Sequence, residues 1–279
     1  FILLFCRLVT DIRKRQFDLS IIYHTKRRTN LLCACAGISH RLGYRNKKYG
    51  VLLNLPVKDH RHLGQKHESV YCLDLLSSIG VRAAKPMLEV SLDDDAERWA
   101  DHFMQSHHLH QDNAPIAVHV GASDPSKCWP LDYFYELMVH LVAKYSVSLV
   151  MIGASDLSPN TSSHIAKRFQ GSVIDLTAQT SLSQLASLLK RCKILISNDS
   201  GPVHIAAAVK TPSVSIFTRN QPGINPQRWR PLEPRSQVVA VPLDKEPSFE
   251  KADSASSDYL RQIKPKVVLE AVDAIYKLC

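Results

Sequence analysis

The stretch "SNDSGPVHIAAA" (residues 197–208) decides how this chain is interpreted, because one apolar run stops there and another begins. The run that precedes it, 194–196, is typical of a buried strand. The run that follows Pro202 is typical of a helix, and proline is favoured at the first helical position. The stretch therefore predicts a point at which a buried strand leads, through a short polar loop, directly into a helix.

The polar residues of this loop have the chemistry of an anion site. Free N–H groups at a helix start attract anions, Ser200 adds a hydroxyl, and Gly201 lets a ligand approach the backbone. His204 lies in the first turn and can donate to a phosphate oxygen. Asp199 would repel a phosphate, so we expect it to cap the helix or to hold a hydroxyl or a histidine. The alternative is that Asp199 and Ser200 only cap the helix and His204 belongs to the core.

A second stretch, "HVGASDPSKCWP" (119–130), has similar chemistry. A strand ends near Val120, a loop of small residues follows, and Lys127 comes just before a helix. Lysine beside a small-residue loop is a suitable counter-charge for a diphosphate. The two stretches together predict one diphosphate site.

The second part of the chain alternates strands with helices. Short apolar runs predict strands at 116–120, 147–152, 173–176, 193–197, 213–217 and 237–241, and periodic patterns predict helices at 131–144, 160–169, 181–190 and 202–209. The pair Ser181 and Gln184 resembles a capping box. Alternation of this kind predicts an α/β fold with a parallel sheet, whose ligands bind at the carboxyl ends of the strands.

The first part has a similar but shorter pattern. We expect a helix at 1–15, a strand at 17–23, a helix near 28–36, a loop that contains Gly43 and Gly50, and a helix near 67–79. Residues 91–108 read as a linking helix with an acidic start, and 263–278 as a closing amphipathic helix.

Bulk composition favours a cytoplasmic globular protein. The chain is 45% hydrophobic and 22% charged, and its seven cysteines form no C-x-x-C pair, as expected for reduced thiols. Residues 1–90 carry 16 Lys and Arg against six Asp and Glu, whereas residues 91–279 carry 19 against 20. The excess charge of the first part suits either a solvated surface or an anionic partner.

The motifs of the chain argue against three other enzyme classes. The ten glycines never form the G-x-G-x-x-G of nicotinamide-binding proteins, and no G-x-S-x-G elbow of a serine hydrolase is present. The run Asp93-Asp94-Asp95 matches the D-x-D of metal-dependent glycosyltransferases, but it opens a helix, where acids complement the dipole.

The paired motifs "GAS…KCWP" and "SNDSGPVHIAAA" resemble the donor domain of glycosyltransferase family 9, the ADP-heptose:lipopolysaccharide heptosyltransferases. The likeness extends to residues 176–201, to 212–217 and to the closing helix, and residues 17–44 resemble that family's acceptor domain. The resemblance implies a GT-B fold, which consists of two Rossmann-like domains with parallel sheets. It implies a metal-independent enzyme with no cofactor, whose substrate is an ADP-sugar. The implied domains are 1–112 on the acceptor side, 113–262 for the donor, and 263–279 as a C-terminal helix that could pack back on the first domain.

Site residues follow from the resemblance position by position. The implied donor-binding residues are Ser123, Lys127, Asp156, Thr180, Ser181, Asp199, Ser200, Gly201 and His204. Arg27, Arg41 and Arg45 are expected to bind the acceptor on the basis of the charge count alone. The implied partners are a nucleotide-sugar donor and an anionic glycolipid acceptor of bacterial lipopolysaccharide biosynthesis, with peripheral contact at the inner membrane surface and no nucleic acid.

Two departures from the family pattern bear on activity. The family's first βα unit, with its Gly-rich turn and catalytic Asp, is expected before residue 1, so the first domain is expected to be incomplete and no catalytic base is assigned. The segment Thr218-Arg219-Asn220 stands where the family often has Gly-Pro-Thr. The alternative function is accordingly a non-catalytic nucleotide-sugar-binding remnant.

Overall fold

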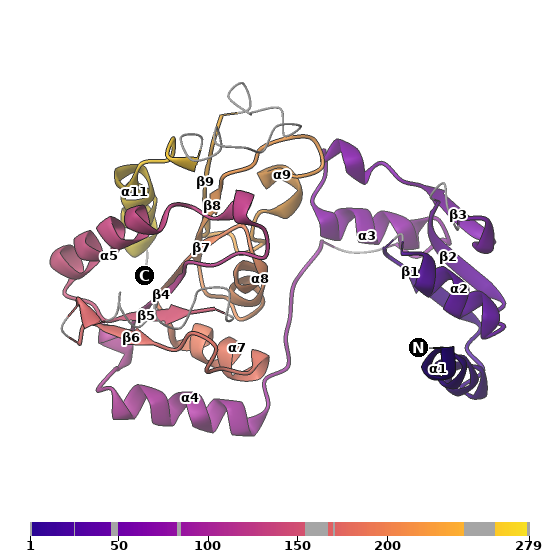
Figure 1. The fold of residues 1–279 in the computed structure, drawn as a ribbon, viewed down its shortest axis with the longest axis horizontal. Coiled ribbons are helices and arrows are strands. Elements are labelled where there is room, and N and C mark those ends of the chain that lie inside the picture. The colour runs from indigo at the N-terminus through magenta and orange to yellow at the C-terminus, as the bar shows by residue number, and fades with distance from the viewer. Residues whose placement is uncertain are drawn as a thin grey trace. The chain divides into compact units, whose positions relative to one another are not determined.

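A computed structural model describes residues 2–24, 26–45, 50–82, 85–153, 167–169, 171–242 and 260–277. The chain divides into two compact units, Phe1–Pro86 and Met87–Cys279. Figure 1 shows that each unit is an α/β assembly with its own sheet. None of the helices in these described ranges combines the length and the apolar composition that a membrane-spanning helix needs.

The first unit contains a three-stranded parallel sheet in the order β1-β2-β3. Its elements are α1 (Ile2–Lys14), β1 (Leu19–Ile22), α2 (Arg27–Cys35), β2 (His40–Arg45), β3 (Leu55–Lys58) and α3 (Glu68–Ser77). A small core under α2 contains Ile22, Cys33 and Leu53, and a second one near α3 contains Leu42 and Leu75. The predicted helices and the first strand are confirmed.

The prediction of a loop around Gly43 was wrong, because that residue lies within β2. A Cβ at Gly43 would sit 3.1 Å from the carbonyl oxygen of Ile22 on β1 and 3.1 Å from a methyl group of Leu53. The glycine is thus required by close approach of a neighbouring strand, not by a turn. Its partner in β3 is Pro56, and proline is tolerated there because β3 is an edge strand.

The second unit contains a six-stranded parallel sheet in the order β6-β5-β4-β7-β8-β9. All six predicted strands are confirmed: β4 (Ile116–His119), β5 (Leu149–Ile152), β6 (Val173–Asp175), β7 (Ile194–Asn198), β8 (Ser213–Phe217) and β9 (Gln237–Ala240). Counted within the unit, this order is 3-2-1-4-5-6, the order of a dinucleotide-binding Rossmann domain. The order reverses between β4 and β7.

Helices cover both faces of this sheet (Figure 1). Their bounds are α4 (Asp94–Ser106), α5 (Leu131–Tyr145), α7 (Leu182–Arg191), α8 (Gly201–Ala208), α9 (Pro226–Trp229) and α11 (Pro265–Tyr276). The helix expected at 160–169 falls largely outside the described residues. Ser181 and Gln184 form the predicted capping box at the start of α7.

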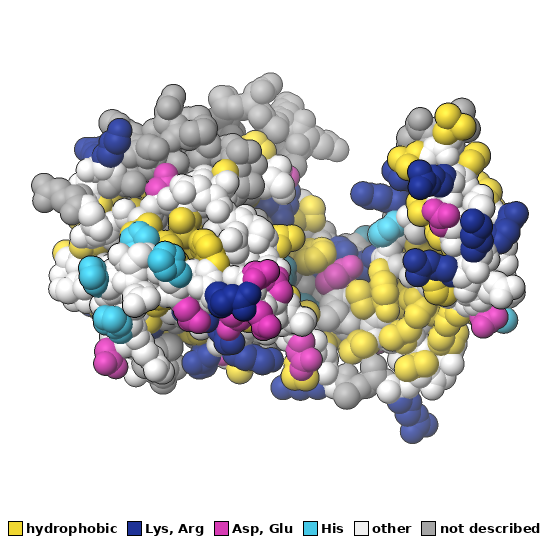
Figure 2. All heavy atoms as spheres, turned by 90° about the horizontal axis from the view of Figure 1, so that it is seen from below, with side chains coloured by type: hydrophobic (Ala, Val, Ile, Leu, Met, Phe, Trp, Pro, Cys, Tyr) yellow, Lys and Arg dark blue, Asp and Glu magenta, His cyan; other side chains and the backbone are white. Residues whose placement is uncertain are grey.

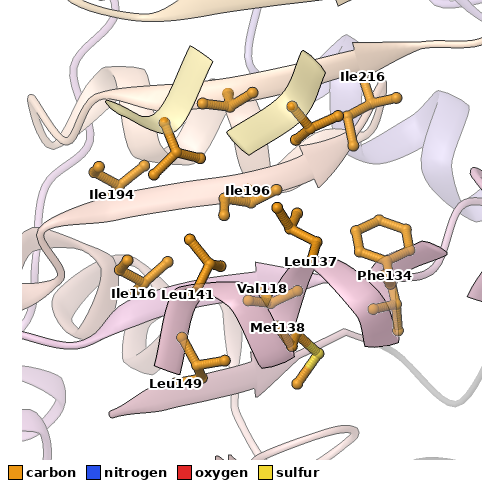
Figure 3. Packing of buried hydrophobic residues seen from close by; sticks show 14 of the residues in the cluster. Ile116, Val118, Phe134, Leu137, Met138, Leu141, Leu149, Ile194, Ile196 and Ile216 are labelled. Carbon is orange, nitrogen blue, oxygen red and sulfur yellow. The ribbon is translucent and has the colours of Figure 1, made fainter. Parts of the chain in front are cut away.

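One face of the sheet packs against α5 and α11, and the other packs against α4, α7 and α8. Alternation along each strand separates the two cores: Ile116 and Val118 face α5, whereas Ala117 between them faces α7. Figure 3 shows α5 lying across the strands, with its apolar residues directed at those of β4, β5 and β7. The side chains that meet there are fully buried and include Phe134, Leu137, Met138, Leu141, Leu149, Ile194 and Ile196.

The boundary between the units falls after Pro86, not after residue 112 as expected, because α4 packs on α7 of the second unit. Lys190 Nζ lies 2.9 Å from Glu97 Oε2. The guanidinium of Arg191 lies 3.1 Å from Glu97 Oε1 and 2.7 Å from Asp101 Oδ1. Figure 2 looks onto this side of the molecule and shows acidic and basic side chains interleaved there.

The closing helix α11 also belongs to the second unit, where it packs on α5, β8 and β9. Its inward side chains Val268, Val272 and Ile275 are fully buried. The segment before it is anchored by the indole N–H of Trp129, which donates to the carbonyl of Ile263 (2.8 Å). Packing of this helix back on the first domain, which the resemblance suggested, stays a prediction.

The core contact of α11 can be tested with two adjacent valines. Val268 is 0% exposed and Val267 is 45% exposed. Val268→Ala removes two buried methyl-sized groups and should lower the free energy of unfolding by about 2 kcal/mol, because a cavity remains. Val267→Ala should change it by less than about 0.5 kcal/mol. Urea unfolding of both variants checks this, and equal losses would contradict the packing of α11.

The contact between α4 and α7 should make stability depend on pH. The hydrogen bond from Arg191 is the largest of the interactions that lower the pKa of Glu97 from its ordinary 4.5 to about 2. The folded state therefore holds this carboxylate charged at a pH where the unfolded chain protonates it. The stabilisation is complete well above pH 4.5 and is lost as the pH falls through 2.

Glu97→Gln should accordingly lower the free energy of unfolding by about 1 kcal/mol at pH 7, the scale of a solvent-screened ion-pair network. The loss should become progressively smaller between pH 4.5 and 2. Asp95→Asn is the matched control, because Asp95 pairs with Arg98 at the exposed surface of the same helix and has no other ion-pair partner among the described residues. Denaturant unfolding across this pH range measures both variants. A cost for Glu97→Gln that does not change with pH would refute the charge-based explanation.

Candidate functional site

The reversal of strand order between β4 and β7 identifies the candidate site. In open α/β sheets, ligands bind outside the carboxyl ends of the strands at this switch point. The loop after β4 contains residues 120–130, and the loop after β7 leads into α8 at Gly201. These are the two stretches whose chemistry predicts a diphosphate site, and the topology places them side by side at one edge of the sheet.

The side chain of Asn198, fully buried at the end of β7, ties these loops together. Its Oδ1 accepts a hydrogen bond from the backbone N–H of Trp129 (3.0 Å). Its Nδ2 donates to the carbonyls of Val120 (3.0 Å) and Gly121 (3.2 Å). The role of Asn198 was not predicted, because an amide in a polar loop carries no local signal of its distant partners.

An ion pair between Lys127 and Asp199 forms the second link between the loops. Lys127 Nζ lies 2.8 Å from Asp199 Oδ2 and also donates to the carbonyl of Asp199 at 3.3 Å. The side chain of Asp199 is 9% exposed and that of Lys127 is 23% exposed. The carboxylate of Asp199 thus holds the ammonium of Lys127 at the site, and part of the Lys127 side chain still faces solvent. Asp199 does not cap α8 and instead positions Lys127.

The start of α8 has no side-chain cap among the described residues. The N-cap residue is Ser200, in an extended conformation, and its hydroxyl makes no capping hydrogen bond. Gly201 is exposed, and a Cβ there would meet nothing within 4 Å. The reading of Ser200 as a plain cap is therefore wrong, and the helix start is open for an anion.

His204 is half-buried, and its ring centroid lies 6.4 Å from that of Trp229 on α9.

A separate histidine lies beneath the site. His119 at the end of β4 is buried, and its Nδ1 lies 3.1 Å from the hydroxyl of Ser197 on β7. The chain after β5 passes directly against it, since a Cβ on Gly153 would lie 3.2 Å from the His119 ring. No local sequence pattern predicts this buried pair.

The segment after β8 braces the loop that contains Lys127. Thr218 Oγ1 donates to the carbonyl of Ser126 (2.7 Å), and the guanidinium of Arg219 lies 2.9 Å from Asp124 Oδ2. The other oxygen of Asp124 accepts from the N–H (3.0 Å) and the hydroxyl (2.7 Å) of Ser126. The bond from Ser126, with help from Arg219, lowers the pKa of Asp124 below its ordinary 3.8. The segment 218–220, which departs from the family pattern, thus has a structural role in this chain.

The remaining donor-side predictions are placed as follows. Ser123 is exposed in the loop after β4. Ser181 is the N-cap of α7 and accepts from the N–H of Gln184, and Thr180 precedes it, half-buried. No hydrogen bond among the described residues joins Thr180 or Ser181 to the loops after β4 and β7. Asp156 lies outside the described residues. Whether these residues bind a donor stays a prediction.

On the first unit, the three arginines differ in their surroundings. The guanidinium of Arg41 is directed at its own unit, since its Nε donates to the carbonyl of Leu52 (2.7 Å) and another nitrogen donates to that of Ile38. Arg27 is the exposed first residue of α2, and Arg45 is the exposed last residue of β2. Acceptor binding by any of them stays a prediction. Within the described ranges, no group of three or more His, Cys, Asp and Glu side chains is arranged to hold a metal ion.

Comparison with known proteins agrees with this architecture. The family model "Glycosyltransferase family 9 (heptosyltransferase)" matches residues 5–257. The lipopolysaccharide heptosyltransferase 2 of Escherichia coli (strain K12) is 25% identical over 280 residues, which are 95% of this chain and 77% of the relative.

Two solved structures share the fold. The E. coli ADP-heptose LPS heptosyltransferase II aligns with a TM-score of 0.77 at 20% identity, over 98% of this chain and 81% of that one. The glycosyl transferase family 9 protein of Veillonella parvula DSM 2008 aligns with a TM-score of 0.79 at 19% identity, over 98% and 78%. The expected α/β GT-B fold class is confirmed, whereas incompleteness of the first domain stays a prediction.

The link between the two loops can be tested by a double-mutant cycle. Lys127→Met leaves the largely buried carboxylate of Asp199 without its counter-ion and should cost about 2 kcal/mol of unfolding free energy. Asp199→Asn in the same chain removes the uncompensated charge and should restore more than half of that loss. Thermal and urea unfolding of the single and double variants measure the coupling. Strictly additive losses would show that the two side chains do not interact in solution.

Proposed function

Because the chain belongs to glycosyltransferase family 9, we propose that it transfers a heptosyl residue from ADP-heptose to an acceptor in the core of lipopolysaccharide. The names of its relatives support this choice of donor and acceptor. The observation that carries the proposal is the convergence of Lys127 and the uncapped start of α8 at the switch point of the sheet. Both features suit the diphosphate of a nucleotide-sugar.

The proposed reaction breaks the bond between the anomeric carbon of the sugar and an oxygen of the β-phosphate. The acceptor hydroxyl oxygen attacks that carbon, and ADP departs with an additional negative charge on its β-phosphate. Lys127 and the N–H groups at the start of α8 would stabilise this developing charge, because they are fixed in place before the reaction. The proton of the acceptor hydroxyl passes to a base that we do not assign. Independence of metal is part of the proposal.

The positive charge of the first unit supports a proposal for where the acceptor binds. Residues 1–90 carry the whole excess of positive charge, and the exposed Arg27 and Arg45 lie at the ends of elements in the first unit. We propose that this unit binds the anionic glycolipid. Two backbone carbonyls already accept hydrogen bonds from the guanidinium of Arg41, so binding of the acceptor by Arg41 would require these bonds to break. Action at the cytoplasmic side of the inner membrane, by peripheral contact, follows from an acceptor of this kind.

The direct test is transfer of labelled heptose from ADP-heptose to a lipopolysaccharide acceptor that lacks it. Transfer by the chain supports the enzyme. Binding of ADP without transfer, by a folded chain, would favour the non-catalytic nucleotide-sugar binder. Absence of ADP binding by calorimetry would overturn the assignment of the site itself.

Lys127→Met should weaken ADP binding by about 1.5–3 kcal/mol, because it removes a charge-assisted hydrogen bond to the diphosphate. The control is Lys266→Met, which removes an equivalent exposed charge from α11 of the same unit. Calorimetry should show normal ADP affinity for the control. An unchanged affinity for Lys127→Met would remove Lys127 from the site.

Gly201→Val should separate ligand binding from helix capping. The space beside Gly201 is open, so the fold should tolerate the valine side chain. The free energy of unfolding should fall by about 1 kcal/mol or less. The same side chain would occupy the position of the diphosphate, so ADP affinity should fall by at least about tenfold. His204→Ala should weaken binding less. Normal ADP binding together with a large drop in melting temperature would support a purely structural role for this turn.

A further inference from the structure

A cavity lies at the edge of the second unit's sheet opposite the candidate donor site. It has a volume of about 590 Å³, within the range of small-molecule sites. Residues that precede β4, β7, β8 and β9 line it, so it opens where these strands begin. The site for the diphosphate lies where the same strands end. Strands of four or five residues separate the two by roughly 15 Å.

The rim of this amino-edge cavity is strongly basic. Five cationic side chains line it, and Asp101 is the one acidic residue in the lining that the structure describes. Three of the cations have carboxylate partners of their own: Lys190 and Arg191 bind Glu97 and Asp101, and Arg235 binds Glu233 at 2.7 Å. The other two cations are Lys193 and Lys210.

Lys193 and Lys210 have no carboxylate partner among the described residues. The ammonium of Lys193 lies 4.1 Å from the ring centroid of Tyr276. The guanidinium of Arg235 donates to the carbonyl of Lys210 at 2.7 Å, which places another cation beside the backbone of Lys210. Cationic side chains that line one cavity and lack a carboxylate partner attract an anion.

Polar surface exceeds apolar surface in the lining of the cavity. Met104, Leu109 and Cys192 also line it, but each is less than 10% exposed and contributes little of that surface. A ligand that fits this lining is polar and carries a charge of about −2 for the two lysines. A phosphomonoester carries about −1.5 to −2 at neutral pH and offers three acceptor oxygens.

We propose that the amino-edge cavity binds a phosphomonoester, held by Lys193 and Lys210. This site is separate from the proposed donor site and does not depend on it. The carboxyl ends of α7 and α8 lie at the same edge, and their dipoles disfavour an anion. Binding should therefore require both lysines together, which makes their removal a sensitive test.

The test titrates phenyl phosphate into the protein with ADP present in excess, so that the donor site is filled. Lys193→Gln/Lys210→Gln should weaken phenyl phosphate binding by at least about tenfold, since two charge-assisted contacts are lost. The matched control Lys14→Gln/Lys266→Gln removes two exposed lysines that do not line the cavity and should bind as the unaltered protein does. Phenyl sulfate, a monoanion of similar shape, should bind several-fold more weakly.

The source of the phosphate is distinguished by sedimentation with vesicles. Vesicles of phosphatidylcholine with phosphatidic acid should retain the protein through these two lysines if the ligand is a lipid headgroup, and should fail to retain it if the ligand is a free small molecule. Either result supports the site when phenyl phosphate binds as expected. Equal phenyl phosphate affinity in the two double variants, or no binding by a folded protein, would overturn the proposal. ADP binding reports on the donor site independently.

Discussion

The hydrogen bonds of one buried amide, Asn198, fix the geometry on which the candidate site depends. β4 and β7 are neighbours in space but lie almost 80 residues apart in sequence, and the loops that follow them have no regular backbone pairing. The Asn198 side chain supplies three bonds across this gap, to Trp129, Val120 and Gly121. Each partner is a backbone group, so the amide specifies the path of the loop and not the identity of its side chains.

With the loops fixed in this way, the charged residues are arranged in advance of any ligand. Asp199 holds the Lys127 side chain, and Arg219 holds Asp124 in the same loop as Lys127, so this lysine is positioned from two sides. Groups that are already oriented cost no reorganisation when charge develops on a leaving diphosphate. The same bonds leave the start of α8 without a side-chain cap, which keeps its N–H groups available. Because Asp199 binds Lys127 and does not cap α8, the same side chain positions the lysine and leaves the N–H groups of the helix start available.

The second unit was predictable from sequence because its strands are buried on both faces. Runs such as 194–196 and 213–217 are apolar throughout, and Ser181 marks the start of α7 with a local signal. The first unit was less predictable, because β2 contains Gly43 and β3 contains Pro56, which are typical of loops elsewhere. The boundary after Pro86 was missed because it depends on ion pairs between α4 and α7, about 90 residues apart. The roles of Asn198 and Asp199 were missed for the same reason, since each depends on a partner about 70 residues away.

The crystal structure of this chain with ADP is the most direct test of the account. The account predicts a β-phosphate oxygen within hydrogen-bonding distance of both Lys127 Nζ and the backbone N–H of Gly201. It also predicts that Asn198 keeps its three bonds and that the loop at 120–130 moves by less than about 1 Å, as in other preorganised sites. A diphosphate bound away from the start of α8, or a loop that rebuilds around ADP with the bonds of Asn198 broken, would contradict it.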